Sequence, residues 1–200
     1  MAEASGTTTD ETGTAASGTR ERVVAAADAL FYARGISAVG MDEVRTAAGV
    51  SLKRLYAEFP GKEHLVLAVL ASRHALWEDG LAQTTAGLDD PRERLLAVFD
   101  FLEVWFREDT FRGCGFINAF GELGATTPAV AAAAREHKQS FQDRIAALAV
   151  EAGADESLGL QLALLAEGAQ TTAAISGRAD AALQARRAAE VLVVAALGPR

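Results

Sequence analysis

The chain has 200 residues, half of them hydrophobic, and a formal net charge of −8 at pH 7. This length and apolar content suffice for a buried core, and the single cysteine excludes an internal disulfide. The acidic balance by itself argues against a nucleic-acid partner, but its distribution does not. Residues 20–62 carry seven bases against five acids, whereas residues 63–200 carry twelve bases against nineteen acids. A mildly basic module attached to an acidic body indicates an anionic partner at one end.

The N-terminal third of the sequence predicts a tail followed by four helices. Residues 1–18 are dominated by Thr, Ala, Gly, Ser and acids and are predicted to be disordered. Helices are expected over residues 19–34, 41–48, 51–59 and 62–81, the first capped by Thr19 and ended by Gly35. We expect residues 19–65 to form one domain, because the mildly basic segment falls there and the acidic body follows it.

The remaining sequence, residues 66–200, predicts a helical body. Five helices are expected here. The first starts at Asp90, and the second lies in the Gly-punctuated segment 112–123. The other three cover residues 127–153, 155–177 and 179–197. No strand pattern and no repeat period is present, so the fold class is all-α with about nine helices. The apolar run 191–197 is too short to span a bilayer, and the polar N-terminus lacks a signal core. We therefore expect a cytoplasmic protein with no membrane association.

The segment "AAGVSLKRLYAEF", residues 47–59, predicts two short helices joined by the tight turn Gly49-Val50-Ser51. Ser51 is a good N-cap, and the helical wheel turns Leu55 and Phe59 inward with Leu52 beside them. Lys53 and Arg54 then stand outward in the first turn, where the helix dipole disfavours cations. A DNA partner explains this placement, because the second helix of a helix-turn-helix enters the major groove with its N-terminal residues leading.

Each cation has a plausible role in such a complex. Arg54 suits guanine O6 and N7, Lys53 suits a base or a phosphate, and Lys62 at the start of the next helix suits a phosphate. The alternative for any one of these side chains is a solvated surface charge. The full predicted DNA-binding set is Arg45, Thr46, Ser51, Leu52, Lys53, Arg54, Tyr56 and Lys62.

The pattern "FYARGISAVGMDEVRT" followed by "AAGVSLKRLYAEFPGKEHLVLAVL" resembles the TetR/AcrR family of transcriptional regulators. The similarity extends over about residues 20–70, and "RGCGFINAFGEL", residues 112–123, is similar to a segment of many members' ligand domains. The sequence departs from the family pattern at Gly40, where Thr or Ser is usual, and at Arg45, where a small residue is usual. Ala57 and Glu58 replace the aromatic or His residues common before the Phe.

The resemblance implies a ligand-responsive repressor. Such a protein is a homodimer that binds a palindromic operator duplex and is released when a small-molecule inducer enters the helical body. A helical dimeric interaction module without sequence-specific DNA binding is the alternative.

The last two predicted helices carry apolar and small residues over wide arcs, which need cover on more than one side. We expect two helices from each subunit to form a four-helix bundle across a two-fold axis. In the alternative, the last helix packs back on its own subunit. The residues expected at the dimer interface are Leu160, Leu164, Gly168, Thr171, Ile175, Leu183, Ala189, Leu192 and Ala196.

The inducer is expected to be mostly apolar and neutral or cationic. The body is acidic, residues 156–176 hold no Lys or Arg, and Glu167 sits in their apolar middle. In the alternatives, the aromatic residues are core, and Glu167 pairs with Arg135, Arg144 or Lys138 of the preceding helix. The candidate ligand-binding residues are Trp77, Trp105, Phe116, Asn118, Phe120, Phe141, Glu167 and Gln170.

Nothing in the sequence favours an enzyme. There is no Gly-x-Ser-x-Gly motif and no phosphate loop, and "GCGFIN" has Asn118 where a dinucleotide fingerprint needs its third glycine. His64, His74 and His137 lack metal-ligand spacing, so no metal and no cofactor is expected. Cys114 is interpreted as a packing residue, with a redox sensor as the alternative.

Overall fold

The computed structural model describes residues 11–199, and these residues form nine α-helices and no strand. The all-α prediction is therefore confirmed. The chain divides into two compact units, Met1–Val69, here called the head, and Leu70–Arg200, here called the body. Over the described residues, no helix combines the length and the apolar character that crossing a membrane requires.

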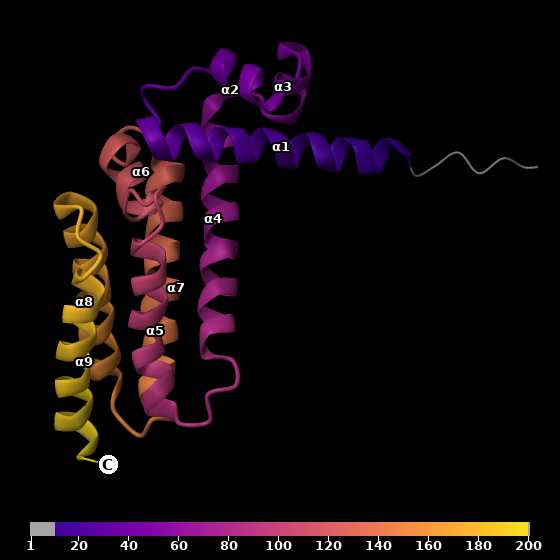
Figure 1. The fold of residues 1–200 in the computed structure, drawn as a ribbon. Helices are drawn as coiled ribbons and strands as arrows, with labels where there is room; N and C mark the ends of the chain where they lie inside the picture. The colour runs from indigo at the N-terminus through magenta and orange to yellow at the C-terminus, as the bar shows by residue number, and fades with distance from the viewer. Residues whose placement is uncertain (1–10, 200) are drawn as a thin grey trace, which may run out of the picture. The chain divides into compact units, whose positions relative to one another are not determined.

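The head contains α1 (Glu11–Arg34), α2 (Met41–Ala48), α3 (Leu52–Glu58) and the first residues of α4 (Lys62–Thr85). Its core is built from apolar residues spaced by whole helical turns, including Val23 and Phe31 of α1, Leu55 of α3 and Leu65 of α4. Figure 1 shows the two short helices α2 and α3 following α1 along the chain. The predicted bounds of α2 are confirmed.

The start of α1 differs from the prediction. Thr19 does not cap the helix; it lies buried inside α1, which begins at Glu11. Of the predicted tail, residues 11–18 are helical and residues 1–10 lie outside the described residues. Gly13 and Gly18 weaken the helix, but the segment 12–18 holds no proline and nothing there forces a stop.

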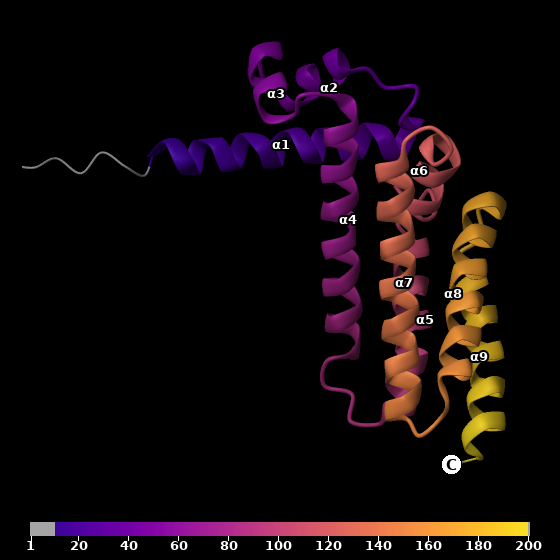
Figure 2. The same ribbon diagram turned by 180° about the vertical axis from the view of Figure 1, so that it is seen from behind.

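The body contains the rest of α4 and the helices α5 (Pro91–Phe106), α6 (Gly115–Leu123), α7 (Pro128–Glu151), α8 (Glu156–Ser176) and α9 (Ala181–Leu197). Figures 1 and 2 show α5, α7, α8 and α9 side by side as a bundle, and α7, α8 and α9 contact one another in sequence. Its core includes Phe99, Leu102, Phe141, Ile145 and Leu162, all nearly inaccessible to solvent. Here α7 and α8 approach closely, and Gly159 allows it: a Cβ there would lie 2.4 Å from Cα of Ala146.

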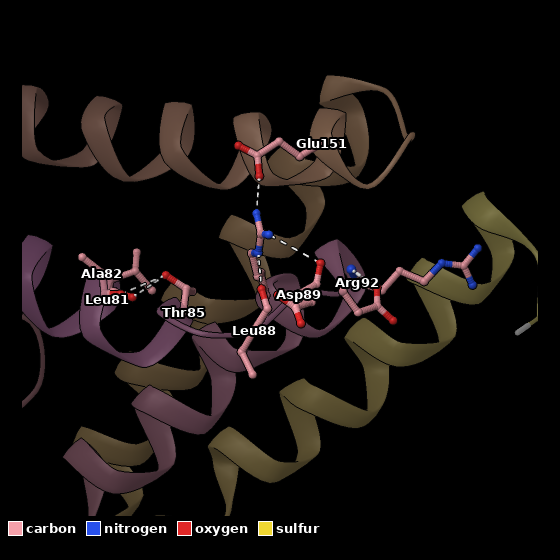
Figure 3. A network of polar contacts seen from close by, with 9 residues as sticks. Leu81, Ala82, Thr85, Leu88, Asp89, Arg92 and Glu151 are labelled. Atoms are coloured by element: carbon pink, nitrogen blue, oxygen red, sulfur yellow. Dashed lines mark hydrogen bonds and ion pairs between the residues drawn. The ribbon is translucent and has the colours of Figure 1, made fainter.

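Helix termini in the body follow their capping residues. Asp90 and Asp155 accept hydrogen bonds from the backbone N–H groups of Arg92 and Leu158, at 2.8 and 3.2 Å. Figure 3 shows the connection after α4, which ends at Thr85, beyond its predicted end; the hydroxyl of Thr85 donates to the carbonyl of Leu81. Arg94 ties this connection to α7, since its guanidinium donates to the Leu88 carbonyl (2.7 Å) and to Glu151 (3.0 Å).

Candidate functional site

The turn between α2 and α3 has the geometry that its sequence predicts. Gly49 adopts a left-handed conformation with φ of 66° and ends α2. The Ser51 hydroxyl accepts the backbone N–H of Arg54 at 3.2 Å and starts α3. Leu55 and Phe59 are 0% and 1% exposed, so one side of α3 is fixed in the head core. The opposite side is therefore presented in a defined orientation.

The outward side of α3 carries Leu52, Lys53, Arg54 and Tyr56, all of them exposed. Leu52 was predicted to lie beside the inward residues, and this is wrong: its side chain is 44% exposed. It follows Ser51 directly, before the helix has turned far enough to bury it. Lys53 has no ion-pair partner among residues 11–199, so its charge is available to an anion.

The other cations of the predicted set have partners within the head. Arg54 Nη2 lies 3.1 Å from Glu58 Oε1, and Arg45 Nε lies 2.6 Å from Asp42 Oδ1. The hydrogen bond to Asp42 raises the pKa of Arg45, which is fully charged at neutral pH in any case. Lys62 Nζ lies 5.8 Å from the centre of the Phe31 ring. The Thr46 hydroxyl donates to the Asp42 carbonyl at 2.9 Å.

Sequence reasoning missed Arg20 of α1, which reaches the C-terminal end of α3. Its Nη1 donates to the Glu58 carbonyl at 3.2 Å, and its guanidinium carbon lies 4.4 Å from the centre of the Phe59 ring. The contact joins residues 38 positions apart in sequence, so no local sequence pattern predicts it. Arg20 thereby anchors the end of α3 to α1.

Several predicted ligand-binding residues come together in the body as one aromatic cluster centred on Trp77. The ring of Trp77 makes edge-on contacts with Phe101, Trp105 and Phe141, at centroid distances of 5.1, 5.7 and 5.4 Å. Phe141 is 1% exposed. The indole Nε1 of Trp77 is buried and has no hydrogen-bond partner among the described residues.

Two histidines border this cluster. His74 of α4 and His137 of α7 bring their Nδ1 atoms within 3.0 Å, and the His137 ring stacks on Phe116 at 3.7 Å. Burial lowers the pKa of His137 to about 3, with smaller contributions from Lys138 and His74, so it is neutral at pH 7. Within residues 11–199, no three His, Cys, Asp or Glu side chains are grouped to hold a metal ion. Cys114 is buried at the start of α6.

Two polar residues of α8, Glu167 and Gln170, were predicted to bind the ligand. Glu167 Oε1 lies 3.6 Å from Lys138 Nζ, which is one of the pairings held open as alternatives. That distance is too long for a hydrogen bond, and Oε1 has no hydrogen-bond donor among the described residues. Gln170 is 2% exposed.

Asn118 and Phe120 lie on the exposed side of α6, away from the aromatic cluster. The Asn118 side-chain amide donates to the Arg112 carbonyl at 3.0 Å, and the Phe120 side chain is 50% exposed. The expectation that both are buried is therefore wrong, and their role in ligand binding stays a prediction. The inward positions of the short helix α6 are instead Phe116 and Ala119.

The predicted dimer face is largely an exposed apolar surface of the body. Leu164 is 67% exposed and Ile175 is 84% exposed, and Leu160 and Leu183 are also exposed. Ala189 is a correction, because it is fully buried within its own body. Leu192 is half-buried, and sequence reasoning missed Val191 and Val194, which are 68% and 49% exposed. We call the surface formed by the exposed apolar residues of these two helices the α8–α9 face; its members are Leu160, Leu164, Ile175, Leu183, Val191 and Val194.

A groove of about 350 Å³ runs between α5 and α9 and was not predicted. Its charged side chains are engaged with the protein itself: Arg186 pairs with Asp100 (2.7 Å) and with Glu190, and Arg92 donates to the carbonyls of Leu197 and Gly198. The groove therefore offers no free charge from either arginine.

A helix pair with a glycine turn, an exposed cationic side on its second helix and a separate helical body define a helix-turn-helix DNA-binding protein. The sequence profile of "Bacterial regulatory proteins, tetR family" matches residues 23–69. A transcriptional regulator of this type from Streptomyces avermitilis is 31% identical, with 89% of this chain and 97% of that chain covered and a TM-score of 0.76. A TetR-family regulator from Streptomyces coelicolor is 26% identical, with 90% and 97% covered and a TM-score of 0.85.

The chain belongs to the TetR family of transcriptional regulators. The activator FasR of Mycolicibacterium smegmatis is 40% identical over 88 residues, which is 42% of this chain and 40% of FasR. The regulator TtgR of Pseudomonas putida is 36% identical over 90 residues, 42% of each protein. The chain thus spans about two fifths of the length of the curated relatives it matches.

Proposed function

We propose that this protein is a ligand-responsive repressor that binds a palindromic operator as a homodimer and leaves it when an inducer occupies the body. The observation that carries the proposal is the outward side of α3. Lys53, Arg54 and Tyr56 are exposed on a helix whose other side is locked into the core by Leu55 and Phe59. A rigid helix with exposed donors can read base edges in the major groove.

The test is selection of binding sites from random duplexes, followed by affinity measurements on the selected site. Arg54→Ala should weaken binding to that site by about 1–3 kcal/mol and relax base preference at one position. Lys62→Ala should weaken binding to all sequences and lower the salt slope by about one unit. If both variants keep the wild-type affinity, α3 is not the reading helix.

The homodimer is supported by the α8–α9 face. Leu160, Leu164 and Ile175 lie exposed on one body, and a large apolar surface of this kind marks an interaction site. In a two-fold dimer, the two α3 helices are expected about 34–36 Å apart, which gives a palindromic operator with half-sites one turn apart. Leu164→Arg should yield monomers by light scattering at micromolar concentration and lose operator binding. A dimeric, active Leu164→Arg variant would refute this interface.

The inducer we propose is mostly apolar and neutral or cationic. Trp77 Nε1 and Glu167 Oε1 are buried without hydrogen-bond partners among the described residues, so a ligand with one acceptor and one donor can satisfy both. Glu167 has only Lys138 nearby, at 3.6 Å, and a cation would add to its compensation. The rings around Trp77 pack edge to face, so binding requires some of them to move.

A thermal-shift screen with a chemically diverse library tests this inducer class. Hits should be neutral or cationic, should raise the melting temperature and should release the selected operator. Trp77→Phe keeps a ring and removes the indole donor, and it should weaken those hits. Stabilisation by anions alone would contradict the proposed charge.

A reporter gene behind the selected operator tests whether the protein represses or activates transcription. FasR is named an activator, so a reporter gene behind the selected site must be repressed by this protein for our proposal to hold. The alternative is a helical dimeric interaction module without sequence-specific DNA binding. A protein that dimerises but selects no duplex sequence would establish that alternative.

A further inference from the structure

The charges of α3 are placed against its dipole at both ends. Lys53 and Arg54 lie in the first turn, and Glu58 is the last residue of this seven-residue helix. Cations at the N-terminus and an acid at the C-terminus are both unfavourable relative to the opposite placement. A DNA partner explains the cations. It does not explain an acid on the same helix, because a carboxylate repels phosphates.

The structure shows what Glu58 contacts. Its Oε1 lies 3.1 Å from Arg54 Nη2, and the side chains are 18% and 44% exposed. The order of the pair, with the base four residues before the acid, is the weaker one for helix stability. The pair is therefore not explained as a device that stabilises α3.

The contact restrains the Arg54 side chain but leaves most of its hydrogen-bond donors free. A guanidinium has five N–H donors arranged along its planar edges, and one oxygen at Nη2 leaves a full two-donor edge free. That edge is what a bidentate contact to guanine requires. Holding the long side chain in place before DNA arrives also reduces the rotamer entropy lost on binding.

Glu58 itself is held from the other side. Arg20 donates to its backbone carbonyl at 3.2 Å and covers the ring of Phe59, which is 1% exposed. The carboxylate thus projects from a backbone segment fixed to both α1 and the head core. A support of this rigidity is what positions a functional side chain accurately.

We propose that Glu58 is a specificity-determining residue of DNA recognition, acting through Arg54. It aims the free edge of Arg54 at a base, and it penalises complexes in which Arg54 turns aside to a phosphate and leaves the carboxylate unpaired near the DNA. Glu58 therefore weakens binding to non-cognate duplexes more than binding to the cognate duplex. This inference rests on the proposed role of α3 in reading DNA.

The test uses the full-length protein, the duplex selected by the wild type and a scrambled duplex of the same composition. Glu58→Gln keeps the shape and an acceptor oxygen but removes the charge. The ratio of cognate to scrambled affinity should fall at least about fivefold, mainly through tighter binding to the scrambled duplex. The matched control is Glu43→Gln, which removes the same charge from the exposed ion pair between Arg34 of α1 and Glu43 of α2. Its ratio should change less than about twofold in physiological salt.

The same substitution in an Arg54→Ala background separates positioning from simple charge. If Glu58 acts through Arg54, Glu58→Gln has no further effect on the ratio there. An equal gain of affinity for both duplexes, or the same fall in ratio without Arg54, would overturn the inference while leaving the proposed function intact. A wild type that selects no sequence would overturn both. Circular dichroism melts establish that each variant is folded.

Discussion

The head and the body expose opposite kinds of side chain. On α3 of the head, the apolar residues Leu55 and Phe59 are buried, and cations face outward. On α8 and α9 of the body, aliphatic residues such as Leu164 and Ile175 face outward, while the aromatic cluster around Trp77 is buried or half-buried. The head therefore suits a charged partner and the body an apolar one. The two surfaces respond differently to salt, because only the first depends on ionic contacts.

Because of this difference, substitutions in the head and in the body are expected to affect binding and stability differently. In the head, the proposed contacts to DNA are made by exposed residues, so their substitution changes binding with little loss of folding free energy. In the body, the proposed ligand contacts in the aromatic cluster pack on the core, so their substitution changes both ligand binding and folding free energy. A ligand-binding assay on a variant with a shortened side chain in the body is therefore informative only when the stability of that variant is measured as well.

The largest expected effect tests this separation. Phe141→Ala should lower the free energy of unfolding by about 3–5 kcal/mol, because Phe141 is 1% exposed and packs against Trp77 at 5.4 Å. Tyr56→Ala, on the exposed side of α3, should change it by less than about 0.5 kcal/mol. Urea unfolding at one fixed protein concentration measures both, since dimerisation makes stability depend on concentration. Equal effects of the two substitutions would abolish the distinction between head surface and body interior.

The second prediction concerns the crossing of α7 and α8. Gly159→Ala should cost about 1–3 kcal/mol, because its Cβ would lie 2.4 Å from Ala146 Cα and backbone atoms cannot move aside cheaply. Gly121→Ala in α6 is the matched control: no atom lies within 4 Å of its added Cβ. That control should be stabilising by up to about 1 kcal/mol. A neutral Gly159→Ala would mean that the two helices are not in close contact in solution.

Features decided by local spacing were predictable from the sequence. The Gly49 turn, the Ser51 cap and the inward pair Leu55 and Phe59 all follow from helix periodicity and capping within a few residues. The exposed apolar residues Leu164 and Ile175 followed from the width of the apolar arc on α8. In each case the determining interaction lies within two helical turns.

Features decided by distant partners were not predictable. The His74–His137 contact joins residues 63 positions apart, and the Arg20–Glu58 contact joins residues 38 apart. Ala189 was misplaced because a small apolar residue suits a subunit core and a subunit interface equally well. Asn118 and Phe120 were misplaced for a related reason: composition identifies α6 as apolar but does not decide which of its sides is covered.

The third prediction uses pH to probe the body interior. The pKa of His137 is lowered to about 3 in the folded protein, against about 6.5 for an exposed histidine. Between these values the unfolded state binds a proton that the folded state does not, so stability falls as the pH drops from 7 toward 4. The steepest slope for one such group is about 1.4 kcal/mol per pH unit.

His137→Phe should flatten this slope, because it removes the proton-binding group while keeping a ring to stack on Phe116. Urea unfolding at pH 7.0, 6.0 and 5.0 provides the measurement. The control is His64→Gln, at an exposed position near the start of α4, which should leave the pH dependence of the wild type in place. An unchanged slope in His137→Phe would show that His137 is hydrated rather than buried.

The smallest expected effect lies in the head and separates capping from charge at one position. The Ser51 hydroxyl accepts the Arg54 N–H at 3.2 Å, so Ser51→Ala should destabilise α3 by about 1 kcal/mol and speed hydrogen exchange of the α3 amides. Ser51→Asp keeps a capping oxygen and should retain wild-type protection. Its added negative charge faces the proposed DNA surface, so it should nevertheless weaken operator binding, and more strongly at low salt. If Ser51→Ala and Ser51→Asp weaken operator binding equally at every salt concentration, the outward side of α3 does not face the phosphates. If Ser51→Asp binds as the wild type does while Ser51→Ala does not, Ser51 acts on DNA only through the stability of the helix it caps.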